Sequence, residues 1–328
     1  MAVIAPTDLA GSSASTAEAF PLLYVPTQPM GTEASSVWVS AHRTILQTAL
    51  AQSGALVFRG FGLASDADFD RFIQAFDWPN FTYAESLSNA VRRNRTERVF
   101  TANEAPPEVS IYLHHEMAQT PRFPSHLFFF CEKASADGGA TPLCRSDVLL
   151  ENLQKRLPEF VKRCRQRGGR YTLTMPGSAD QSSGQGRSWR ETLNVSSPDQ
   201  AEHRLASLGY QWLWLSEDCL RVTTPTLPLV RKTPNGEEVF FNQLIAAFCG
   251  WQDQRNNRTR SVTYGDGTDF DESDLQAAVE TAYDSVYDHE WQAGDVALLD
   301  NYRVMHGRRP FTGQRSVLAS LCEIVAEH

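Results

Sequence analysis

The sequence lacks the features of a membrane or secreted protein. No window approaches the roughly 20 apolar residues that a membrane-spanning helix needs. The first 20 residues are small and polar, and no basic residue precedes an apolar run, which argues against a secretory signal peptide. Their Ser, Thr and Ala content is similar to that of a transit peptide, but the first arginine is Arg43. We therefore expect a flexible lead-in at residues 1–20, a cytoplasmic location and no membrane partner.

Paired cysteines and an excess of positive charge are also absent. No Cys-x-x-Cys spacing occurs among the six cysteines, which are Cys131, Cys144, Cys164, Cys219, Cys249 and Cys322. This usage favours reduced, mostly buried thiols over a disulfide framework or a zinc site. A formal net charge of −9 and a pI near 5.4 argue against an extended phosphate-binding surface. We expect no nucleic-acid partner.

What the sequence does contain is a series of short apolar stretches, together with a few amphipathic segments. Apolar residues at helical spacing predict helices near 38–52, 66–76, 146–167 and 271–287. Runs rich in β-formers predict strands at 54–61, 98–103, 111–117, 127–131, 238–242, 294–301 and 315–322. The length of 328 residues and the hydrophobic content of 41% are sufficient for a buried core. We predict a mixed α and β fold, with a double-stranded β-helix (jelly-roll) core and flanking helices, in a single domain over residues 21–328.

The stretch Ile111–Met117 carries the strongest chemical signal. Side chains two apart on a strand share a face, so His114 and Glu116 are predicted to project together while His115 points the other way. A neutral imidazole and a carboxylate are two thirds of the 2-His-1-carboxylate set that holds non-haem Fe(II). His306 is the candidate for the third ligand, and closing a jelly roll would bring it back across 306 − 114 = 192 residues. An isolated His-x-Glu is a weak signal by itself, and we expect His115 to be structural or solvated.

These residues and five surrounding runs resemble the Fe(II)- and 2-oxoglutarate-dependent dioxygenases of the taurine dioxygenase (TauD/TfdA) superfamily, in its clavaminate synthase-like branch. The runs are Arg98–Glu104, Leu113–Gln119, Phe129–Glu132, Gly138–Pro142 and His306–Phe311. The resemblance implies that His114, Glu116 and His306 are the iron ligands. It also implies that Thr141 and Arg315 bind 2-oxoglutarate, and a planar guanidinium suits a carboxylate because it offers two parallel donors. Arg308 and Arg309 are the alternatives to Arg315.

The same resemblance implies an activity. We expect an oxygenase that uses O2 to oxidise an aliphatic C–H bond of a small metabolite, most simply by hydroxylation, with release of succinate and CO2. An amino acid or amino-acid derivative is the favoured substrate. Desaturation or ring closure by the same cofactor chemistry is an alternative, and halogenation is disfavoured because Glu116 is present. A non-catalytic jelly-roll binding protein would be expected to have lost one of the four residues His114, Glu116, His306 and Arg315, and all four are present.

The substrate contacts are less well marked. In the family a second arginine, four residues after the first, anchors an acidic group of the substrate, and Ala319 stands at that position here. Another cation would then have to hold a substrate carboxylate, or the carboxylate could be masked on a carrier protein. The loop 176–190 is predicted to be a lid, although an ordinary surface loop fits the sequence equally well. The candidate substrate residues are Asn103, Arg187, Trp189, Arg190 and Asn242, with Arg308 as a further cation.

Overall fold

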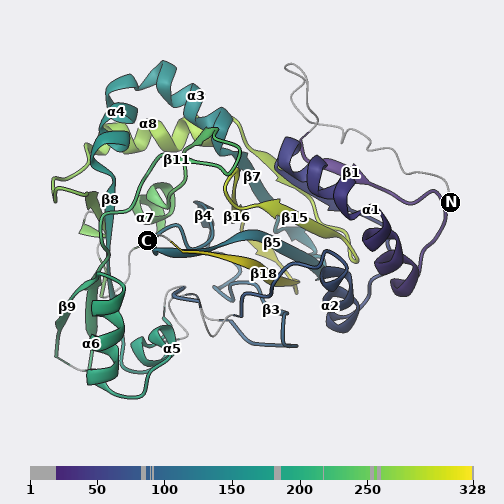
Figure 1. The fold of residues 1–328 in the computed structure, drawn as a ribbon, viewed down its shortest axis with the longest axis horizontal. Helices are drawn as coiled ribbons and strands as arrows, with labels where there is room; N and C mark the ends of the chain where they lie inside the picture. Colours follow the sequence, from purple (N-terminus) through teal and green to yellow (C-terminus); the bar gives the residue numbers. More distant parts are fainter. Residues whose placement is uncertain are drawn as a thin grey trace.

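The largest sheet of the computed structural model has six strands and crosses the middle of the molecule (Figure 1). The structure describes residues 20–82, 86–88, 90, 92–180, 186–216, 218–251, 255–256 and 260–326. Only the β1–β2 pairing in this sheet is parallel, and the other pairings are antiparallel. Its strands, in spatial order, are β1 (Leu22–Tyr24), β2 (Ala55–Phe58), β15 (Val296–Asp300), β5 (Arg122–Lys133), β18 (Ser316–Ala326) and β3 (Phe100–Thr101).

A second, antiparallel sheet of four strands carries three of the predicted site residues, His114, Thr141 and His306. Its order is β14 (Tyr287–His289), β7 (Thr141–Arg145), β16 (Val304–Arg308) and β4 (Ile111–His114). A third sheet contains β13 (Val262–Tyr264), β8 (Gly169–Met175), β10 (Leu220–Thr223) and β9 (Gln211–Trp214). Two short ribbons complete the strands, one of β11 (Arg231–Lys232) and β12 (Glu238–Val239), the other of β17 (Phe311–Thr312) and β6 (Asp137–Gly138).

Eight helices surround the sheets in the described part of the chain. They are α1 (Thr32–Ser53), α2 (Asp66–Gln74), α3 (Ser146–Arg156), α4 (Pro158–Arg167), α5 (Trp189–Leu193), α6 (Pro198–Ser207), α7 (Leu244–Gly250) and α8 (Glu272–Tyr283). The predicted segment 146–167 forms two helices because Pro158, which has no backbone N–H, begins α4. Helix α2 begins at Asp66, as predicted, and Ser65 and Asp68 form a capping box at its N-terminus. Figure 1 places α1 and α2 at one end of the molecule and α3, α4 and α8 along its upper edge.

The core lies on both faces of the six-stranded sheet. On one face, Phe128 and Phe130 of β5 pack in a cluster with phenylalanines of α2, namely Phe69 and Phe72. On the other face, Phe129 of β5 belongs to the cluster that reaches the second and third sheets. Strand β5 is therefore buried on both sides, and the phenylalanines of α2 are core residues.

Two expectations about the chain cannot be compared with the structure in full. The lead-in predicted at 1–20 lies outside the described residues except for Phe20, and residues 181–185 of the predicted lid also lie outside them. The single-domain boundary at 21–328 therefore stays a prediction.

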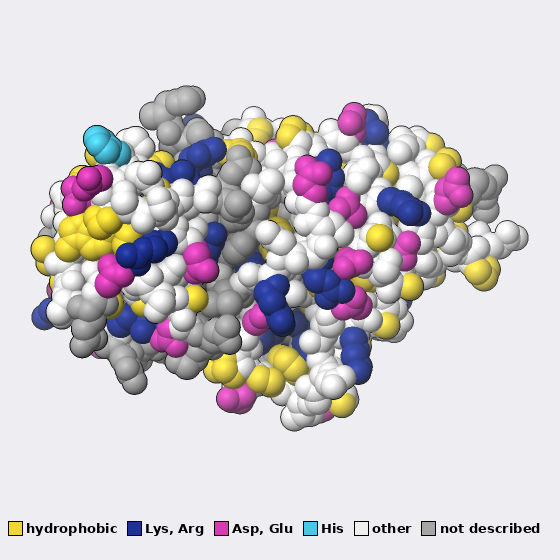
Figure 2. All heavy atoms as spheres, turned by 90° about the horizontal axis from the view of Figure 1, so that it is seen from below, with side chains coloured by type: hydrophobic (Ala, Val, Ile, Leu, Met, Phe, Trp, Pro, Cys, Tyr) yellow, Lys and Arg dark blue, Asp and Glu magenta, His cyan; other side chains and the backbone are white. Residues whose placement is uncertain are grey.

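Among the described residues, no helix is both long and apolar enough to cross a membrane. On the face shown in Figure 2, the described acidic and basic side chains are intermixed, so this face has no basic stripe for nucleic acid.

Candidate active site

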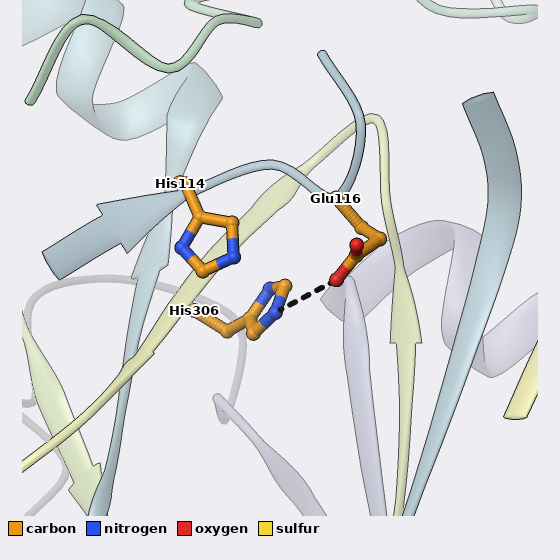
Figure 3. Close-up of side chains that lie close together, drawn as sticks. All are labelled: His114, Glu116 and His306. Atoms are coloured by element: carbon orange, nitrogen blue, oxygen red, sulfur yellow. Dashed lines mark ion pairs between the residues drawn. The ribbon is translucent and has the colours of Figure 1, made fainter. Parts of the chain in front are cut away.

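His114, Glu116 and His306 converge in the folded chain (Figure 3). One ligand atom from each lies within 4.8 Å of the others. His306 on β16 pairs directly with His114 at the end of β4, and their ring centroids are 4.4 Å apart. Nε2 of His306 lies 3.8 Å from Oε2 of Glu116. The fold thus joins residues far apart in sequence through one antiparallel strand pair.

The local geometry differs from the predicted strand. Strand β4 ends at His114, and Glu116 lies in the turn that follows, next to Met117 with a φ of 59°. The prediction that the strand extends through Met117 is therefore wrong. Glu116 reaches the same place as His114 because the chain turns towards β16, and not because of strand alternation.

A buried hydrogen-bond network fixes this turn. Asn301 accepts from the Glu116 backbone N–H at 2.8 Å through Oδ1, and its Nδ2 donates to the Glu116 carbonyl at 3.0 Å and to the Pro124 carbonyl at 2.7 Å. The ring of His115 points away from the triad, where it contacts the Asn301 carbonyl and Ser146 Oγ. His115 therefore has a structural role, which is one of the two roles expected for it from the sequence.

We predict that Asn301→Ala destabilises the protein. The change leaves a buried N–H and two buried carbonyls without their partner, at about 1–3 kcal/mol for each unsatisfied group. Urea unfolding should show a fall of several kcal/mol in the free energy of unfolding. Asn152→Ala is the control because Asn152 makes one long, half-buried contact with Ser285 at 3.4 Å. Equal stability of the two variants would show that Asn301 does not hold the turn.

The two histidines are in the protonation state that suits a metal ligand. Burial lowers the pKa of His114, although the Glu116 charge opposes this. Burial lowers the pKa of His306 further, and the nearby His114 adds to the effect. Both imidazoles are therefore neutral at neutral pH. Nδ1 of His306 is buried with no hydrogen-bond partner among the described residues, so its ring is not held as an ordinary core histidine would be. Two neutral imidazoles and a carboxylate form a donor set that fits Fe(II).

The triad forms part of the wall of a cavity of about 480 Å³. Thr141 and Arg315 line the same cavity. Thr141 Oγ1 accepts a hydrogen bond from Trp291 Nε1 at 2.9 Å, and Arg315 Nε donates to the Gly139 carbonyl at 3.1 Å. Burial lowers the pKa of Arg315 to about 10, so its guanidinium remains charged at neutral pH.

The hydrogen-bond partners distinguish Arg315 from the two alternatives, Arg308 and Arg309. Arg308 also lines the cavity, but it donates to the carbonyls of Ala105, Pro106 and Val109 at 2.6–2.9 Å and so fixes that segment. Arg309 forms an ion pair with Asp288 at 2.8 Å, and both side chains are partly exposed. In contrast, the terminal nitrogens of Arg315 have no protein partner within the described residues.

The predicted substrate residues occupy different places. Asn103 lines the cavity, and its Oδ1 accepts from the Ala105 N–H. The other four are not among the described residues that line the cavity. Arg187 donates to the Ser86 and Ser88 carbonyls, while Trp189 and Arg190 contact Asp218. Asn242 is fully buried and donates to the Leu229 carbonyl, so it is a hydrogen-bonded core residue.

Sequence reasoning missed two arginines of the cavity wall. Arg92 donates to the Glu116 carboxylate, and Arg255 forms an ion pair with Asp180 at 2.8 Å. Nothing in the local sequence distinguishes Arg92 from the exposed arginine beside it, Arg93. Ala319, unlike these two arginines, has an apolar side chain. It is buried, and its backbone pairs with Phe100.

The sequence and the fold match known proteins over nearly the whole chain. Residues 24–321 match the family described as "Taurine catabolism dioxygenase TauD, TfdA family". A clavaminate synthase-like protein of Arabidopsis thaliana is 37% identical over 286 residues, covering 87% of this chain and 86% of that protein. The dapdiamide synthesis protein DdaC of Enterobacter agglomerans is 27% identical, with 84% of each chain covered. The crystal structure of PvcB from Pseudomonas aeruginosa shares the fold, with a TM-score of 0.56, 18% identity and coverage of 98% of this chain and 90% of that one. The chain therefore belongs to the TauD/TfdA dioxygenase family and is a 2-oxoglutarate-dependent non-haem iron dioxygenase.

Proposed function

We propose that His114, Glu116 and His306 hold Fe(II) and that the cavity beside them binds 2-oxoglutarate and a small metabolite. The observation that carries the proposal is the convergence of three ligand atoms within 4.8 Å on the cavity wall, with Glu116 and His306 buried and His114 half-buried. Bound Fe(II), together with 2-oxoglutarate and O2, supplies the oxidising chemistry for attack on an aliphatic C–H bond, with release of succinate and CO2. The protein's own side chains bind and orient the substrates and exclude water.

Thr141 and Arg315 are the proposed 2-oxoglutarate residues. Trp291 donates to Thr141 Oγ1, so the Thr141 hydroxyl proton is left to point towards another acceptor. The cavity lies beside it, with the half-buried guanidinium of Arg315 on the same wall. A hydroxyl donor and a guanidinium together suit the carboxylate that is remote from the iron. In this arrangement Trp291 orients Thr141 without contacting the co-substrate.

We predict that Trp291→Phe weakens 2-oxoglutarate binding moderately. The change keeps an aromatic ring but removes the N–H that orients Thr141. The loss of one hydrogen bond, about 0.5–1.5 kcal/mol, corresponds to a roughly two- to tenfold rise in Kd. Titration of the Mn(II)-loaded protein with 2-oxoglutarate measures this change. Trp214→Phe is a matched control, since the indole N–H of Trp214 donates to Glu202. A Kd raised equally in both variants would remove the specific role of Trp291.

The proposed reaction is hydroxylation of a small substrate, an amino acid or amino-acid derivative. The cavity volume of about 480 Å³ is in the range of small-molecule sites. Its wall combines apolar groups such as Phe129 and Val317 with polar ones such as Asn103 and Arg255, which suits a molecule with an aliphatic part and a charged part. The name of the dapdiamide synthesis protein, a relative at 27% identity, also favours a small-molecule substrate, free or carrier-bound.

Anaerobic spectroscopy followed by product analysis tests this function. The protein with Fe(II) and 2-oxoglutarate should show a weak metal-to-ligand absorption band, and a true substrate from a metabolite panel should shift it. After oxygen is admitted, mass spectrometry should show a product that has gained one oxygen atom. A product that has lost two hydrogens would indicate desaturation or ring closure instead. No band with Fe(II) and 2-oxoglutarate would contradict the proposed function itself.

We also propose that the six-stranded and the four-stranded sheets form the two halves of a jelly-roll core in a single domain over residues 21–328. Support comes from the pairing within both sheets, which is antiparallel except between β1 and β2, and from the cluster that packs residues of both sheets together. A cytoplasmic location is proposed as well. All six cysteines are free, and four of them are buried, as expected for a reducing compartment.

A further inference from the structure

A buried arginine contacts the carboxylate of the triad. Arg92 Nη2 donates to Glu116 Oε1 at 3.2 Å and to Oε2 at 3.0 Å. Only 6% of the arginine side chain and 4% of the glutamate side chain are exposed. Removing one partner of a buried ion pair leaves an uncompensated charge, so the two residues depend on each other. Arg92 lies on the cavity wall with the triad.

The segment that carries Arg92 is attached to the six-stranded sheet. The Arg93 N–H donates to Thr101 Oγ1 at 2.9 Å, and the Thr101 N–H donates to the Arg93 carbonyl at 2.9 Å. The Arg92 guanidinium lies 5.3 Å from the ring centroid of Phe100. Phe100 and Thr101 form β3, which pairs with β18. Arg92 therefore reaches Glu116 from a fixed position.

Glu116 depends on such a partner more than the two histidines do. His114 and His306 lie on paired strands, whereas Glu116 lies in a turn. Asn301 fixes the backbone of Glu116 but does not contact its carboxylate. Within the described residues, Arg92 is the side chain that hydrogen-bonds this carboxylate. A carboxylate can give a metal one oxygen or both, and a donor that contacts both oxygens opposes the second mode.

We propose that Arg92 is a positioning residue that holds Glu116 as a one-oxygen ligand, which keeps positions on the iron open for 2-oxoglutarate. The inference rests on the proposed function, because it assumes that Glu116 is a ligand. Without Arg92 the carboxylate gains the freedom to offer its second oxygen to the metal. This change favours metal binding and disfavours 2-oxoglutarate, because the second oxygen takes up a position that the co-substrate needs.

The test measures the two affinities of Arg92→Met separately, without turnover. The apoprotein is titrated with Mn(II), and the Mn(II)-saturated protein is then titrated with 2-oxoglutarate. We expect Mn(II) to bind at least as tightly as to wild type and the 2-oxoglutarate Kd to rise about 10- to 100-fold, the range typical of an outer-shell partner. A purely structural role would weaken both. Arg93→Met is the matched control, since Arg93 is 76% exposed and pairs with Glu104; both affinities should stay at wild type.

A double-mutant cycle separates the positioning role from a direct effect of charge on 2-oxoglutarate. At saturating Mn(II), Arg92→Met should cause no further loss of 2-oxoglutarate affinity in a Glu116→Gln background, because its effect passes through the carboxylate. An equal loss in both backgrounds would overturn the proposal. Wild-type 2-oxoglutarate affinity in Arg92→Met, or weaker Mn(II) binding, would overturn it too. If Arg92→Met does not fold, Arg92→Lys and Arg92→Gln give the same comparison. Unchanged Mn(II) affinity in Glu116→Gln alone would instead contradict the triad, so the two failures are distinguishable.

Discussion

His306→Ala is expected to abolish turnover while leaving the protein folded. The variant loses one of the three proposed ligands. His114, at the end of a strand, and Glu116, in a turn, remain without a third donor. Because His306 has no hydrogen-bond partner for Nδ1 in the described structure, its removal breaks no such bond in the core. Product formation should fall to background, and Fe(II) binding should weaken strongly.

Three measurements check this result. Circular dichroism and thermal unfolding establish that the variant is folded, titration with Fe(II) measures the metal affinity, and product analysis measures turnover. His203→Ala is the matched control, because His203 is an exposed residue of α6. It should behave as wild type in all three. Substantial activity in His306→Ala would remove His306 from the iron site and with it the proposed triad.

Arg315→Lys is expected to weaken 2-oxoglutarate binding about 10- to 100-fold. The lysine keeps the positive charge but loses the planar pair of donors. Loss of a charge-assisted hydrogen bond, about 1.5–3 kcal/mol, gives this range. Titration of the Mn(II)-loaded variant with 2-oxoglutarate measures the Kd, and turnover at saturating 2-oxoglutarate should recover much of the wild-type rate.

The control for this variant is Arg309→Lys, in which the same substitution falls on an arginine that pairs with Asp288 at the surface. The affinity for 2-oxoglutarate should be unchanged there. If Arg315→Lys also binds with wild-type affinity, the co-substrate role passes to Arg308. The structure argues against that outcome, since the Arg308 guanidinium already holds the Ala105, Pro106 and Val109 carbonyls.

Local patterns in the sequence predicted many of the helices and strands, and the types of residue in the proposed site. Apolar residues at helical spacing located α2, and a continuous apolar run located the buried strand β5, because both patterns are local. The spacing of His114 and Glu116, with His306 far away, indicated a metal site. Ala319 also showed at once that this position offers no cation to a substrate.

How these residues meet depends on contacts between distant segments of the folded chain. Glu116 joins the histidines through a turn held by Asn301, whose three hydrogen bonds connect segments more than a hundred residues apart. Local patterns contain no information about such long-range pairing, so alternation along a strand predicted that His114 and Glu116 lie together, but for the wrong geometric reason.

The same limit applies to the arginines. Arg92 and Arg93 are neighbours in one polar stretch, yet one is buried against Glu116 and the other is largely exposed. Arg308 and Arg315 both line the cavity, but one holds backbone carbonyls and the other leaves its terminal nitrogens without a protein partner among the described residues. An arginine side chain is long and its charge is the same everywhere, so its role depends on which acceptors the fold brings within reach. That assignment belongs to the tertiary structure alone.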